Sequence, residues 1–217
     1  MTTPLSQFAK PDAEQYKNVR KLFVIPNYVF PPEAPPEGHE LLERYWSEVR
    51  DHIANLERSL GTVTHIYHES LFVEGDEGFD ILRGLNPKAT SFIQAICQSS
   101  AKLEMTEDRD LVIECSDWQR CLSIGLGSQK VMKTAMDGYQ ESSRLRYEYI
   151  ATRIDETLED NQVAALFIFE DHRVQFPADI QVFYVAPTAL DTLKRWINDQ
   201  MQSTKPVSQD ESESVGD

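Results

Sequence analysis

The sequence lacks the motifs that identify the common nucleotide-binding and hydrolytic folds. It contains no phosphate loop of the G-x-x-x-x-G-K-[ST] type, no G-x-G-x-x-G turn after a strand and no G-x-S-x-G elbow. The nearest glycine-rich pattern, at residues 125–128, follows a predicted helix and is better explained as a turn between two helices. No cofactor is therefore predicted. An α/β-hydrolase is not predicted either, because the G-x-S-x-G elbow that defines that fold is missing.

Cysteine is scarce and long apolar runs are missing. The 217 residues include only three cysteines, Cys97, Cys115 and Cys121. A small and odd number of cysteines does not fit a disulfide framework. No apolar stretch approaches the roughly 20 residues that span a bilayer, and residues 1–11 lack the apolar core of a signal peptide. We therefore expect a soluble, cytoplasmic protein with no membrane partner.

Positive charge is also in deficit, because 21 basic residues face 36 acidic ones and the net charge is −15. Such a chain repels phosphate backbones and anionic lipids, so no nucleic-acid partner is predicted. Residues 203–217 carry no aromatic side chain and have the composition of a disordered acidic tail. The tail accounts for only −3 of the charge, so the acidic excess belongs mainly to the body.

What the sequence does contain is a succession of strand and helix patterns. The apolar segments 21–25 and 62–73 predict strands, and residues 40–60 between them carry one apolar stripe at spacings of three and four, which indicates an amphipathic helix. A strand, a long helix and a second strand form a crossover unit with parallel strands. The proline-rich segment 31–38 is either a stiff connector, which we favour, or a docking segment for a partner.

A helical block from about 76 to 158 follows this unit. Asn86 and Pro87 have the pattern of an N-cap and first turn, and Thr106 is expected to cap a further helix with Glu107 in its first turn. Ser128 is expected to cap the last helix of the block. The remaining elements are two strands and a final helix, at 163–169, 180–185 and 188–202.

These elements predict an α/β fold with an open, mostly parallel sheet of about four to five strands. Helices cover its faces, and the large helical insertion separates strands 2 and 3. The fifth strand would be a short one at 174–176. The predicted organisation is a loose N-terminal arm at 1–13, a single body at 14–202 and the tail at 203–217. The order of elements in the second half resembles the C-terminal domain of release-factor and Pelota-type translation proteins, an order that implies no function by itself.

Candidate site residues follow from the expected position of the strand ends. In open parallel sheets, ligands bind beyond the carboxyl ends of the strands. Asp171, His172 and Arg173 follow the third predicted strand and could supply an acid, a base and a cation for catalysis. A charged turn between two strands is the alternative reading. Asn27 and Glu69, at the ends of the first two strands, are candidate binding residues.

No metal site is predicted. His65 and His68 invite comparison with metal ligands, but side chains three apart on a strand point to opposite faces of the sheet. The cysteines include no C-x-x-C pair. Neither residue type therefore forms a chelating set.

Two hypotheses of function remain. The first is a non-enzymatic regulatory or protein-interaction module, because the sequence has no catalytic signature and aromatic residues are enriched at interfaces. The candidate interface aromatics are Trp46, Trp118, Tyr139, Tyr147 and Tyr149. The second is a small-molecule enzyme that uses Asp171, His172 and Arg173. A protein partner is expected under the first, and a homodimer is compatible with both.

Overall fold

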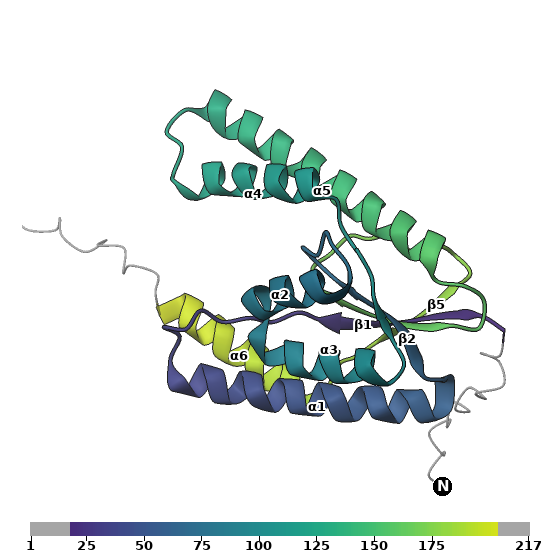
Figure 1. Ribbon diagram of the computed structural model, residues 1–217. Coiled ribbons are helices and arrows are strands. Elements are labelled where there is room, and N and C mark those ends of the chain that lie inside the picture. Colours follow the sequence, from purple (N-terminus) through teal and green to yellow (C-terminus); the bar gives the residue numbers. More distant parts are fainter. Residues whose placement is uncertain (1–17, 204–217) are drawn as a thin grey trace, which may run out of the picture.

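The computed structural model describes residues 18–203 and shows a five-stranded sheet in which every pairing is parallel (Figure 1). The strand order is β3-β2-β4-β1-β5. The strands are β1 (Arg20–Pro26), β2 (Val63–His68), β3 (Lys102–Leu103), β4 (Val163–Ile168) and β5 (Ile180–Tyr184). The predicted α/β fold, with a helical insertion between the second and third predicted strands, is confirmed.

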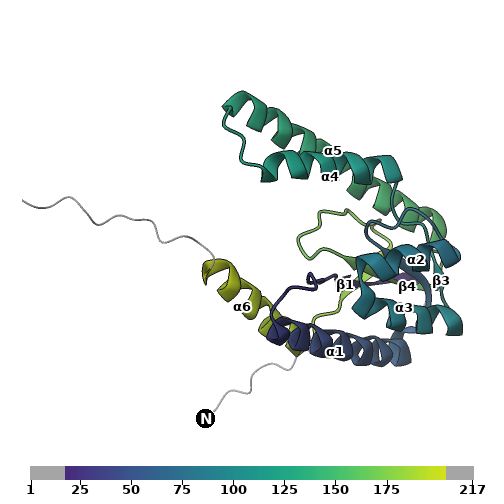
Figure 2. The same ribbon diagram turned by 60° about the vertical axis from the view of Figure 1, so that its left-hand side comes forward.

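Residues 18–203 also form six helices. They are α1 (Pro36–Leu60), α2 (Gly75–Leu85), α3 (Pro87–Ser99), α4 (Arg109–Ser123), α5 (Gln129–Thr157) and α6 (Thr188–Ser203). Helices α1, α3 and α6 pack on one face and α5 on the other (Figures 1 and 2). The change of face follows from the strand order, because the connection from β3 to β4 reverses the direction of those from β1 to β2 and from β2 to β3.

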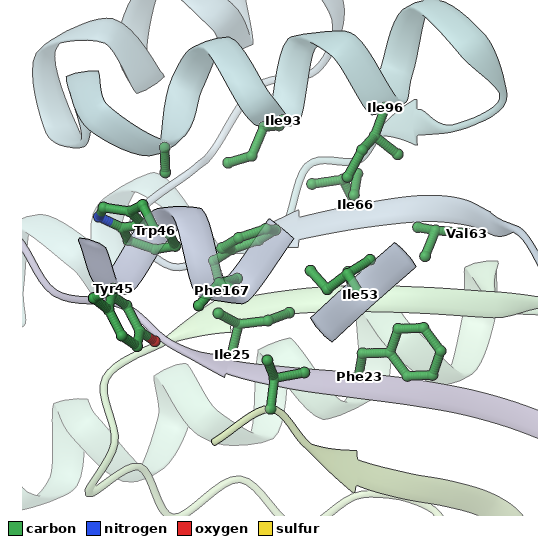
Figure 3. Close-up of a cluster of buried hydrophobic side chains, with 14 of the residues drawn as sticks. Phe23, Ile25, Tyr45, Trp46, Ile53, Val63, Ile66, Ile93, Ile96 and Phe167 are labelled. Carbon is green, nitrogen blue, oxygen red and sulfur yellow. The ribbon is translucent and has the colours of Figure 1, made fainter. Parts of the chain in front are cut away.

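Strand alternation builds a separate apolar core on each face. Phe23, Ile25 and Phe167 point toward α1 and form the core shown in Figure 3, with Trp46 from that helix. The intervening residues of the same strands pack under α5. Every residue of β4 is buried, as its unbroken apolar run predicted.

The fifth strand lies elsewhere than expected. Residues 174–176 form no strand, and β3 instead pairs with His65 and Ile66 at the edge of the sheet. A strand of two residues has no alternation of its own, so only its partner defines it. Helix α4 also begins later than predicted, because its N-cap is Asp108. The hydroxyl of Thr106 instead accepts the backbone N–H of His68, at 3.0 Å.

Helices α4 and α5 form a hairpin that projects beyond the sheet (Figures 1 and 2). Their packing is close at Gly138, where an added Cβ would lie 2.4 Å from the indole of Trp118. Ser128 caps α5 as expected, since its hydroxyl accepts from the backbone N–H of Val131. The predicted arm at 1–13 lies outside the described residues, as does the tail beyond Ser203, which itself ends α6.

Candidate functional site

The carboxyl edge of the sheet brings the two predicted binding residues together. The side-chain amide of Asn27, after β1, donates to Glu69 Oε1 at 2.7 Å. Glu69 follows β2, and its Oε2 accepts the backbone N–H of Phe169, at 3.0 Å. One carboxylate therefore connects the ends of three strands, since Phe169 follows β4.

Asn86 extends this cluster to the helices. Its amide donates to Asn27 Oδ1 at 2.6 Å, and its own Oδ1 caps α3 by accepting the backbone N–H of Ala89. Burial raises the pKa of Glu69, against the hydrogen bonds from Asn27 and Phe169, which favour its charged form. Because each Glu69 oxygen already accepts from the protein, the cluster is a closed structural tie among strand ends.

A second buried carboxylate, Glu107, was not expected to matter. It is fully buried between β3 and α4, where it accepts from the backbone N–H of Ser70 at 2.6 Å. The guanidinium of Arg146, on α5, forms a bidentate ion pair with the Glu107 carboxylate, with nitrogen to oxygen distances of 2.5 and 2.6 Å. Burial opposes the charge on Arg146, but the hydrogen bonds to Glu107 outweigh it and raise its pKa. This pair fixes the root of the hairpin to the end of β2.

The two histidines of β2 lie on opposite faces, as alternation predicts. His65 stacks on Tyr67 and His68 on Phe167. His68 Nδ1 lies 2.6 Å from the carbonyl oxygen of Glu69, while its buried Nε2 has no hydrogen-bond partner in the described part of the chain. Burial lowers the pKa of His68 to about 4, so the ring is neutral at pH 7. Within residues 18–203, no three His, Cys, Asp or Glu side chains are grouped to hold a metal ion.

The three candidate catalytic residues lie in the turn after β4, and the structure separates them. Asp171 and Arg173 line a groove beside α5. His172 does not line it, because its ring packs against Phe176 and its Nδ1 accepts the backbone N–H of Val174, at 3.3 Å. Asp171 and Arg173 therefore share the groove, whereas the imidazole of His172 stabilises the backbone of the turn.

The groove has a volume of about 1000 Å³. It runs between α5 and the loop that connects β4 to β5, so it lies on the face of the sheet opposite α1. Five apolar or aromatic side chains line it: Met136, Tyr139, Tyr147, Ala151 and Phe169. Two of these, Tyr139 and Tyr147, belong to the aromatic set expected from the sequence at an interface.

No model of a protein family, no curated protein and no solved structure matches this chain. No helix within residues 18–203 is both long and apolar enough to cross a membrane.

Proposed function

We propose that the protein is a non-enzymatic interaction module that binds a segment of a partner protein in the groove between α5 and the β4–β5 loop. The observation that carries this proposal is the exposure of large apolar side chains inside a hollow. Met136 of α5 and Phe169 of the loop both line the groove, and they are 41% and 52% exposed. Apolar side chains in a concave surface gain most from a partner that excludes water.

The charged side chains of the groove add a basis for selectivity. Arg144 is already paired with Glu141 and Glu148 along α5. By contrast, neither Asp171 nor Arg173 makes an ion pair within residues 18–203, although both line the groove. A partner segment with a basic and an acidic residue beside its apolar anchors would match this arrangement, because complementary charges select partners and fix their register.

The strand-end cluster supports a binding role over catalysis. A general base needs a lone pair that can reach a substrate. The oxygens of Glu69 and of Glu107 accept from Asn27, Phe169, Ser70 and Arg146 instead. Glu69 and Glu107 therefore stabilise the frame that holds the groove.

The test compares the proteins that co-purify with full-length variants from the native cells. Phe169→Ser removes one apolar wall of the groove, and Tyr184→Ser is the matched control, because Tyr184 is 65% exposed on β5 and does not line the groove. We expect one set of partners to be lost at least tenfold with Phe169→Ser and retained with Tyr184→Ser. Retention of every partner by Phe169→Ser would contradict the proposal.

A small-molecule enzyme is the second candidate, and the groove supplies the observation that favours it. Asp171 and Arg173 share a hollow whose volume is at the upper end of the roughly 300–1000 Å³ typical of ligand pockets. A ligand present at 100 times its Kd would stabilise the fold by about 2.7 kcal/mol. A metabolite panel screened by thermal unfolding should then yield a ligand whose effect disappears in Arg173→Ala. A panel without any stabilising compound would count against this candidate.

A further inference from the structure

The two walls of the groove converge on Arg20, the first residue of β1. Its guanidinium Nη2 donates to Asp155 of α5 and its Nε to Asp179 at the end of the β4–β5 loop, both at 2.8 Å. The same guanidinium also donates to the backbone carbonyls of Asp155 and Leu158. The chain that precedes β1 therefore enters the fold where α5 and the loop meet, at one end of the groove.

The chain turns immediately before this point, since Asn18 has a φ of 72°, in the left-handed region. The lining residues of α5 extend from Thr152, three residues from Asp155, to Met136. At 1.5 Å per residue the lined part of α5 is about 24 Å long. A fully extended segment from Phe8 to Tyr16 would cover about 26 Å at 3.3 Å per residue, and Tyr16 comes four positions before Arg20 in the sequence.

We propose that residues 5–16 of the chain bind in its own groove and compete there with the partner. Phe8 and Tyr16 supply aromatic side chains spaced to the two ends of the groove. Lys10 and Asp12 lie between them in the sequence and are opposite in charge to Asp171 and Arg173 of the groove, which form no ion pair with another residue of 18–203. This inference rests on the groove assigned under the proposed function and adds the regulation of that site.

The other terminal segment fits the groove poorly. Residues 204–217 follow α6, which packs on the face of the sheet opposite the groove. They carry four acidic residues and only two valines as apolar side chains. A segment joined directly to the groove also has a local concentration in the millimolar range, so weak contacts suffice to hold it.

Zero-length cross-linking of the purified full-length protein tests this inference without any partner. A carbodiimide joins the Lys10 amine to the Asp171 carboxylate as an amide and takes up the water as a urea, but only where the two groups touch. We expect a Lys10–Asp171 cross-link as a main product in the monomer. An equal mixture of ¹⁵N-labelled and unlabelled chains should give this product without mixed-isotope peptides.

Two variants make the result decisive. Phe8→Ser removes the aromatic anchor of the segment and should lower the Lys10–Asp171 yield at least fivefold, whereas Tyr184→Ser should leave it unchanged. Coupling of Lys10 to scattered exposed carboxylates would overturn the inference, as would a product found only between differently labelled chains. Because no partner is present, loss of this cross-link leaves the partner-capture result intact, and failed capture leaves the cross-link intact. If both proposals hold, Phe8→Ser captures more partner than the natural chain.

Discussion

Replacing Glu107 by Gln tests whether the buried ion pair with Arg146 sets the stability of the hairpin root. The amide keeps the volume of the side chain and an acceptor for Ser70, but it leaves the charge of Arg146 unmatched. Breaking a buried pair costs about 3–5 kcal/mol. The lower end, about 3 kcal/mol, applies because the Arg146 side chain retains 18% exposure. In a domain of this size the melting temperature should fall by about 6–12 °C.

The assays are thermal and urea unfolding followed by circular dichroism, completed as a double-mutant cycle with Arg146→Met. The double variant should be more stable than Glu107→Gln alone, because it leaves no buried charge without a partner. Arg144→Met is the matched control, since Arg144 lies on the same helix and pairs only with exposed carboxylates. It should not change stability measurably. Additive effects in the cycle, or a loss with Glu107→Gln no larger than the control, would refute the reasoning.

Four further variants probe the stability of the fold. Because burial lowers the pKa of His68 to about 4, the native state binds fewer protons than the unfolded state, and stability should fall by up to about 3 kcal/mol as the pH drops from 6.5 to 4. His68→Phe should flatten this part of the urea-unfolding profile, and an unchanged profile would be contrary evidence. Gly138→Ala should lose about 1–3 kcal/mol in thermal unfolding, because its Cβ meets Trp118, whereas Gly84→Ala, in open space on α2, should gain up to about 1 kcal/mol. Glu69→Ala should lower the free energy of unfolding by about 2–4 kcal/mol, because two donors lose their acceptor. The backbone amide of residue 169 should then exchange its hydrogen faster. Unaltered exchange there would argue against the structural role of Glu69.

The fold could be predicted because its signals are local. The apolar run of β4 indicated a strand covered on both faces, and the Asn86-Pro87 pair correctly marked the start of α3. Strand β3 could not be found, because its two residues are defined by hydrogen bonds to β2 and not by a pattern of their own. Thr106 misled for a related reason, since its hydroxyl serves the backbone of a strand 38 residues away.

The candidate site could also be predicted only in part. The contact between Asn27 and Glu69 follows from the strand-end rule, because all strands of a parallel sheet end at one edge, and these two residues meet there across the end of β4. The Glu107–Arg146 pair and the groove depend on the angle of the hairpin to the sheet, which no periodicity encodes. His172 shows why sequence spacing alone does not define a site. Asp171 and Arg173 line the groove, but the imidazole of His172 accepts a backbone hydrogen bond within the turn.

Site-specific photo-cross-linking tests the central claim, that the groove receives a segment of a partner protein, most directly. A photo-reactive residue would replace Met136 in the full chain, in the native cells, with the same residue at Tyr184 as the control. We expect a covalent product with a partner peptide from position 136 and none with that peptide from position 184. Equal capture of that peptide at both positions, or no partner product at position 136, would contradict it.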